Sequence, residues 1–70
     1  MLTFSYQIVP SGGGKPLTRG SLYIADVESA KRHVQTVAAP GVVAEPGMEV
    51  ILQDFMGSEI WRGPYLGKRG

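Results

Sequence analysis

Residues 26–41 read DVESAKRHVQTVAAPG, and this stretch decides the fold because it carries the clearest helical period in the chain. Asp26 is a typical N-cap, because its carboxylate accepts hydrogen bonds from the free N–H groups of the first helical turn. Pro40 and Gly41 stop the helix. The stretch therefore predicts one amphipathic helix with a single apolar stripe, made by Val27, Ala30, Val34, Val37 and Ala38.

Segments in which apolar and polar residues alternate flank this helix on both sides. Residues 2–8 and 48–53 have a period of two, which predicts strands with one buried face. Residues 17–24 are expected to pair back on the first strand, and residues 59–62 to return on the other through a turn at 54–58. The order strand–strand–helix–strand–strand predicts an α+β fold, in which one helix packs on one face of an antiparallel sheet of three to four strands.

Length and composition restrict the classes of protein to which the chain can belong. Its 70 residues suffice for one small domain, residues 1–70, in which residues 66–70 are expected to be a frayed tail. The absence of cysteine and the single histidine, His33, exclude disulfides, thiolate zinc sites and multi-histidine metal sites. A formal net charge of +1 gives no strong overall attraction for nucleic acid. We therefore expect no cofactor.

Neither a targeting signal nor a membrane segment is evident in the sequence. Residues 1–9 have no basic n-region and no continuous apolar run, unlike a signal peptide. No stretch approaches the roughly 18 apolar residues of a membrane helix. The expected compartment is the cytoplasm, of a cell or of a virus-infected cell, and no membrane partner is expected.

Two motifs that invite a catalytic interpretation are better explained as structure. Residues 12–16, Gly-Gly-Gly-Lys-Pro, lack the Ser or Thr that follows the lysine of a phosphate-binding loop, and no helix is expected after them. Asp26, Ser29 and His33 make a nominal triad along one helix, without the pocket and the oxyanion hole that a triad needs. The 6 acidic residues are spread over several elements. We expect a protein that is not an enzyme.

The adjacent residues Ile60 and Trp61 bear on what lies on the second face of the sheet. Neighbours in a regular strand point to opposite faces, so one of the two lies on the face away from the helix, near Ile51. The pattern does not decide which. Trp and Arg are favoured anchors of protein interfaces, which makes Ile51, Trp61 and Arg62 candidate partner-binding residues. A small core that is incompletely covered accounts for the same residues.

The layout of the chain resembles two groups of small proteins. Residues 25–32 (ADVESAKR) and 60–65 (IWRGPY) resemble segments of small uncharacterised proteobacterial α+β domains, which imply no known activity. Ala-Lys-Arg at 30–32, Ile-Trp at 60–61 and Gly-Lys-Arg at 67–69 resemble motifs of small phage anti-CRISPR proteins. The second resemblance implies that Lys31 and Arg32 dock on a large CRISPR surveillance complex and obstruct target DNA. The Gly-rich loop, Pro64 and a less basic hairpin depart from that family.

These observations favour a non-catalytic protein-binding module, which the second resemblance narrows to a phage or mobile-element inhibitor of a host complex. Lys31 and Arg32 would dock electrostatically, and Trp61 with Ile51 would anchor. Arg62 is a further partner-binding candidate. A homodimer formed through the open sheet face explains the same residues without a foreign partner. A weak nucleic-acid-binding module is a third hypothesis, in which aromatic rings stack on bases beside a scattered basic set: Arg19, Lys31, Arg32, Arg62, Lys68 and Arg69.

Overall fold

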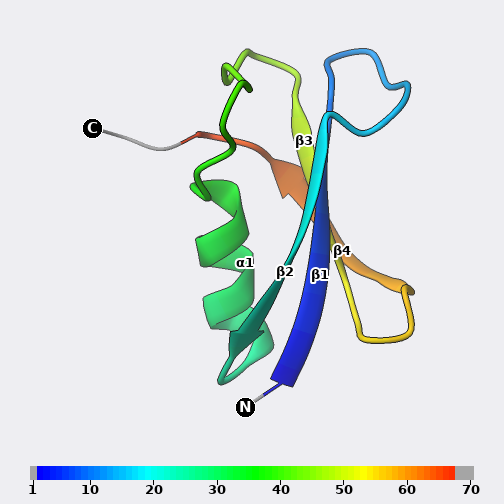
Figure 1. The fold of residues 1–70 in the computed structure, drawn as a ribbon, viewed down its shortest axis with the longest axis vertical. Helices are drawn as coiled ribbons and strands as arrows, with labels where there is room; N and C mark the ends of the chain where they lie inside the picture. Colours follow the sequence, from blue (N-terminus) through cyan, green and yellow to red (C-terminus); the bar gives the residue numbers. More distant parts are fainter. Residues whose placement is uncertain (1, 68–70) are drawn as a thin grey trace.

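Five elements follow one another in the predicted order (Figure 1), in a computed structural model that describes residues 2–67. They are β1 (Leu2–Val9), β2 (Thr18–Ile24), α1 (Val27–Gln35), β3 (Glu49–Gln53) and β4 (Glu59–Pro64). The four strands form one antiparallel sheet in the order β2-β1-β3-β4, and α1 lies on one of its faces. The predicted α+β fold is confirmed, with four strands in the sheet.

The helix begins where the sequence predicts but ends earlier. The Asp26 carboxylate accepts a hydrogen bond from the Ser29 backbone N–H at 2.7 Å, and this bond lowers the pKa of Asp26 below its ordinary value. α1 ends at Gln35 with Thr36 as its C-cap, whereas the apolar stripe continues to Ala38. The Gln35 carbonyl at the helix end accepts hydrogen bonds from backbone N–H groups of the C-terminal segment, so it has partners without a further helical turn.

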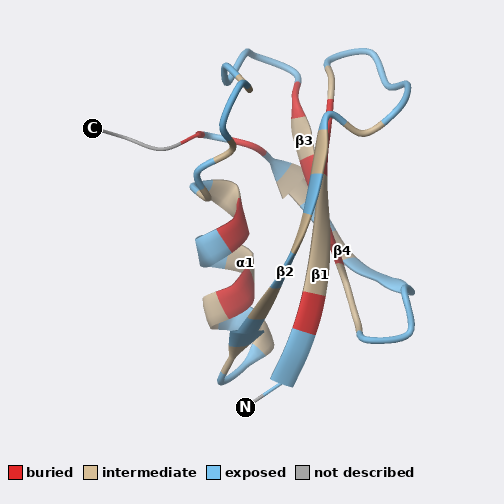
Figure 2. Cartoon of the chain, viewed as in Figure 1, coloured by how far each residue is buried: buried red, intermediate tan, exposed pale blue. Residues whose placement is uncertain are grey.

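The core lies between α1 and the sheet, where the buried residues gather (Figure 2). The strand registers bring apolar partners together on the helix-facing side: Ile8 pairs with Val50, and Tyr6 with Leu52. The buried cluster consists of Phe4, Ile8, Ala30, Val34, Met48, Val50, Leu52 and Tyr65. Burial of each large apolar side chain stabilises the fold by about 1.5–3 kcal/mol, so this cluster is the main source of stability.

Two aromatic side chains cover glycines of the two outer strands. Tyr6 pairs with Gly20 across β1 and β2, and a methyl group at Gly20 would collide with the phenol ring. The Trp61 ring covers Gly63, two residues further along β4, in the same way. A side chain at either glycine would displace the ring that occupies its place. Both glycines are therefore packing requirements of the strands that contain them.

The segment after β4 folds back on the end of the helix. Tyr65 is 5% exposed, and its hydroxyl donates a hydrogen bond to the Val37 carbonyl at 2.6 Å. The backbone N–H groups of the next two residues donate to the Gln35 carbonyl, at 2.8 and 3.1 Å. These contacts correct the expectation of a frayed end for residues 66–67. The rest of the predicted tail, residues 68–70, lies outside the described residues.

The loops gather at the two ends of the sheet. The β1–β2 loop, residues 10–17, and the α1–β3 connector, residues 36–48, lie at one end, and the β3–β4 turn, residues 54–58, lies at the other (Figure 1). The Gly-rich part of the first loop leads into β2 and not into a helix. Among residues 2–67, no helix is long and apolar enough to cross a bilayer.

Candidate protein-binding surface

The predicted anchors Ile51 and Trp61 lie on opposite faces of the sheet. Trp61 pairs with Leu52 and packs against the buried core on the helix-facing side. Ile51 pairs with Arg62 and is partly buried on the face away from α1. Trp61 is therefore not the member of the Ile60–Trp61 pair that lies near Ile51, and the two predicted anchors do not form one apolar patch. Their role in partner binding stays a prediction.

A β-bulge at Ile60 interrupts the regular alternation of β4. The register shifts between Leu52, which pairs with Trp61, and Gln53, which pairs with Glu59, so Ile60 is an extra residue in β4. The rule that neighbouring side chains point to opposite faces assumes a regular strand. Trp61 is the member of the adjacent pair that packs on the core, and Ile60 is 41% exposed.

The two basic residues of the helix differ in their surroundings. The Lys31 ammonium lies 3.2 Å from a carboxylate oxygen of Glu28 and 6.0 Å from the centre of the Trp61 ring. It therefore takes part in an ion pair and in a cation–π contact. Arg32 is exposed, and its charge contributes to the lowered pKa of Asp26. The ion pairs found within residues 2–67 do not include Arg32.

Arg62 is held between two carboxylates on the open face of the sheet. Its guanidinium lies 2.9 Å from an oxygen of Glu59 and 3.5 Å from one of Glu49. The hydrogen bond and the charge of Glu59, and to a smaller extent Glu49, raise the pKa of Arg62 above its usual value. Because all three side chains are solvated, the pairs add little stability. The group has a net negative charge and is not a basic anchor.

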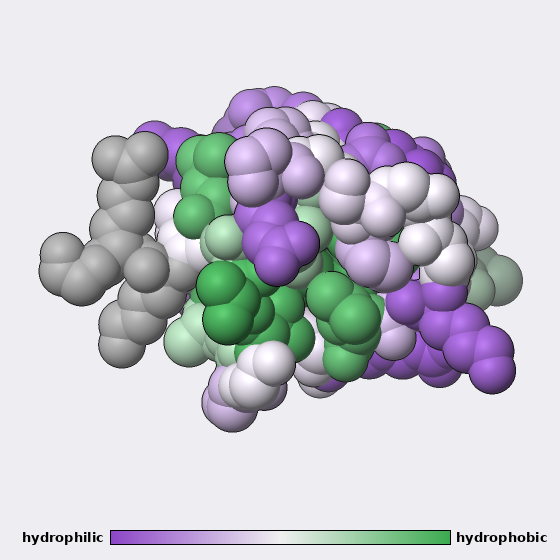
Figure 3. All heavy atoms as spheres, turned by 90° about the horizontal axis from the view of Figure 1, so that it is seen from above, coloured by the Kyte–Doolittle hydropathy of each residue, from purple (hydrophilic) through white to green (hydrophobic). Residues whose placement is uncertain are grey.

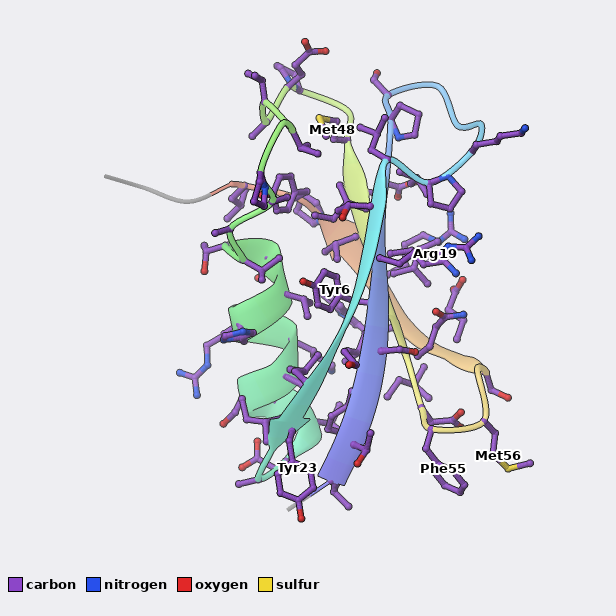
Figure 4. The ribbon with its side chains drawn as sticks, viewed as in Figure 1. Tyr6, Arg19, Tyr23, Met48, Phe55 and Met56 are labelled. Carbon is purple, nitrogen blue, oxygen red and sulfur yellow. The ribbon has the colours of Figure 1, made fainter. Side chains whose placement is uncertain are left out.

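Two adjacent apolar side chains project from the β3–β4 turn, and we call Phe55 and Met56 the hairpin tip. Phe55 is 80% exposed and Met56 is 77% exposed, and both point away from the sheet (Figure 4). Single exposed apolar residues are common on protein surfaces. Two large ones side by side at the end of a hairpin form a compact apolar protrusion, which the sequence analysis did not single out.

Hydrogen bonds hold this turn in one conformation. The Asp54 carboxylate accepts from the backbone N–H groups of Met56 and Ser58, at 2.9 and 3.0 Å. The Gly57 N–H donates to the Asp54 carbonyl at 3.0 Å, and the Gln53 side-chain amide donates to the Gly57 carbonyl at 2.9 Å. Gly57 has a φ of +87°, the left-handed conformation that closes a three-residue hairpin loop.

A sequence signal for the hairpin tip exists. Asp favours the first position of a β-turn and Gly the fourth, so Asp54 and Gly57 together delimit the turn. The two residues between them occupy its corner, which points to solvent. Turn chemistry therefore identifies Phe55 and Met56 as exposed, whereas hydrophobicity alone assigns them to a core.

A second apolar surface lies at the opposite end of the molecule, between the β1–β2 loop and the α1–β3 connector. Leu17 and Val43 are exposed there, and Figure 3, which views this end, shows apolar side chains gathered among polar ones. Together with Val42 and Met48 they line an open hollow of about 470 Å³, and a second hollow of about 320 Å³ lies beside Tyr65. This end is apolar like the hairpin tip, but it is hollow and does not protrude.

The residues considered for catalysis have structural contacts. Asp26 caps α1 through the Ser29 N–H, and His33 is exposed. Within the described part of the chain, no group of three or more His, Asp or Glu side chains is placed to hold a metal ion. Over the same residues, no polar or charged side chain is buried.

No protein-family model, curated protein or solved structure matches this chain.

Proposed function

We propose that this chain is a non-catalytic protein-binding module that inserts the hairpin tip into an apolar pocket of another protein. The observation that supports this is the exposure of Phe55 and Met56, at 80% and 77%. Full burial of a side chain of this kind is worth about 1.5–3 kcal/mol. The fold leaves that free energy unused, and a complementary pocket would use it.

The conformation of the turn also favours binding. The hydrogen bonds of Asp54 and the left-handed Gly57 fix the backbone beneath the tip. A partner therefore does not have to order the loop, which lowers the entropic cost of association. Aromatic residues and Met are also among the types that are enriched at protein interfaces.

The charge near the tip favours a protein partner over a nucleic acid. Residues 53–60 contain Asp54 and Glu59 and no basic residue, so this end of the hairpin repels phosphate groups. Two members of the basic set are also paired with carboxylates: Arg62 with two of them and Lys31 with one. We expect the partner's pocket to be apolar, with a neutral or basic rim.

The resemblance to phage anti-CRISPR proteins suggests a different contact on the same chain. It assigns docking to Lys31 and Arg32, on the helix and not at the hairpin tip. The two hypotheses predict different sensitive residues. Arg32→Glu weakens binding in the anti-CRISPR hypothesis and leaves the affinity unchanged when the hairpin tip is the contact.

Capture from an extract of the source cells, followed by titration of the captured protein, tests the proposal. We expect the double variant Phe55→Ser/Met56→Ser to bind at least tenfold more weakly than the wild type, a loss of about 1.4 kcal/mol. Val43→Ser is the matched control, because Val43 is 77% exposed at the opposite end of the molecule. Circular dichroism checks that each variant is folded.

Two results would contradict the proposal. One is an unchanged dissociation constant for the folded double variant. The other is a partner that the Val43→Ser variant loses and the double variant retains, since this would move the contact to the hollow end of the molecule. A cross-linking group placed at residue 55 and then at residue 43 distinguishes the two ends directly.

A further inference from the structure

The two outer strands of the sheet differ in how their free edges are protected. β4 contains the bulge at Ile60 and ends at Pro64, and both features interrupt pairing with another strand. β2 pairs with β1 in continuous register from Thr18 to Ile24 and contains neither a proline nor a bulge. A regular edge of this kind is a template for a further strand.

The side chains of β2 divide regularly between the two faces of the sheet. Arg19, Ser21 and Tyr23 are exposed on the face away from the helix, and the residues between them are partly buried on the helix side. In an antiparallel pair, alternate residues direct their N–H and C=O groups to each side of a strand. β1 lies on one side of β2 only, so the groups on the outer side have no strand partner in the sheet of residues 2–67.

We infer that β2 pairs with β2 of a second copy of this chain, antiparallel and about a two-fold axis at Ser21. Ser21 is the midpoint of Thr18–Ile24, so this register uses the whole strand. A shift by one residue would exchange the faces of the sheet. A shift by two residues would leave only five of the seven residues paired.

The full-length register is chemically complementary. It places Arg19 opposite Tyr23 of the second copy, twice, and these residues lie near opposite ends of β2 (Figure 4). A guanidinium beside a phenol ring is a favourable cross-strand pair, and no like charges face each other. On the helix side, Leu22 faces Gly20 of the second copy, where the Tyr6 ring fills the space of the missing side chain. The apolar layer therefore continues across the junction.

The open sheet face is a poorer site for a second copy. It carries Arg62 with Glu49 and Glu59, and a face-to-face dimer would remove these charges from water. Pairing along β2 leaves the three side chains in solvent. This inference does not depend on the hairpin tip, because the β3–β4 hairpin lies at the edge of the sheet opposite β2.

Sedimentation equilibrium of variants that carry opposite charges at position 21 tests the inference. We expect the mass of the wild type to rise from monomer towards dimer between about 10 µM and about 1 mM. Ser21→Lys and Ser21→Glu each place like charges together at the two-fold axis, so each alone stays monomeric. An equimolar mixture of the two variants restores association, since lysine then faces glutamate. Ser58→Lys is the matched control, an exposed serine in the β3–β4 turn, and it associates like the wild type.

Circular dichroism checks that both Ser21 variants are folded, so that a monomeric mixture reports on the β2 contact and not on a loss of folding. A wild type that is monomeric up to about 1 mM would overturn the inference. So would a Ser21→Lys variant that associates like the wild type, or a mixture of the two variants that stays monomeric. Loss of association in Ser58→Lys alone would place the self-contact at the hairpin tip and would also overturn it.

Discussion

Phe55 and Tyr65 are both aromatic residues in the segments next to β4, one before the strand and one after it. Phe55 is 80% exposed, whereas Tyr65 is 5% exposed. The ring of Tyr65 covers the core, and its hydroxyl reaches the Val37 carbonyl. The turn that carries Phe55 projects away from the core, and the Phe55 ring points into solvent (Figure 4). An aromatic residue outside the strands therefore stabilises the fold when it is buried, like Tyr65, and is available to a partner when it is exposed, like Phe55.

The largest expected effect is on the free energy of unfolding when each of the two rings is removed by substitution with alanine. Tyr65→Ala removes a buried aromatic ring, and we expect it to lower the free energy of unfolding by about 3–5 kcal/mol. Phe55→Ala removes an exposed ring and should change it by no more than about 0.5 kcal/mol. Urea unfolding followed by circular dichroism measures both. Equal losses in the two variants would show that the hairpin tip belongs to the core.

The glycines of the two segments give the next comparison. Gly57 and Gly67 both have left-handed backbones, with φ of +87° and +78°. A methyl group at Gly57 meets open space, so Gly57→Ala carries only the conformational cost, about 1–2 kcal/mol. At Gly67 the methyl group would also collide with the Ala44 side chain, so Gly67→Ala should be the more destabilising change. The reverse order in urea unfolding would contradict the packing of the C-terminal segment on the connector.

The smallest change removes only the Tyr65 hydroxyl. Tyr65→Phe keeps the ring and leaves the Val37 carbonyl without its hydrogen bond, which should cost about 0.5–1.5 kcal/mol. Phe55→Tyr is the matched control. It adds a hydroxyl in solvent and should leave the free energy of unfolding unchanged.

The same hydroxyl makes this contribution depend on pH. Burial raises the pKa of Tyr65 above its ordinary value of 10.0. Since the folded state holds this proton more tightly than the unfolded state, the contribution is fully present below pH 10 and is lost as the pH rises through the folded-state pKa. The stability difference between wild type and Tyr65→Phe should therefore shrink above about pH 10. A difference that stays constant, or grows, at alkaline pH would contradict a buried, protonated phenol.

Elements with local signals are the ones that the sequence predicted well. The helix start depends on Asp26 and on residues within one turn of it, and the strands depend on alternation over a few positions. The helix end was less accurate, because Gln35 is capped by backbone groups about thirty residues further along the chain. Within the candidate site, the Lys31–Glu28 pair follows the i, i+3 spacing of one helix, whereas the contact of Lys31 with Trp61 and the pairing of Arg62 with Glu49 join different elements.

The faces of the sheet show a second limit of local patterns. Alternation places Ile51 on the open face, as observed, but it cannot place Ile60 and Trp61, because one inserted residue shifts the register of β4. A bulge is fixed by pairing with β3 and by the Trp61 ring over Gly63. These contacts do not form a period in the sequence.

The sequence by itself determined the fold class, the order of the elements and the apolar stripe of the helix, because propensity, capping and hydrophobic period act between neighbours in the chain. The turn residues Asp54 and Gly57 also indicate, from the sequence alone, that the hairpin tip is exposed. Only the tertiary structure decided that Tyr65 is buried, that Trp61 faces the helix and that the Lys31 ammonium lies near the Trp61 ring. Burial is a property of residues that meet in space, and the Tyr65 hydroxyl meets a carbonyl 28 residues away along the chain.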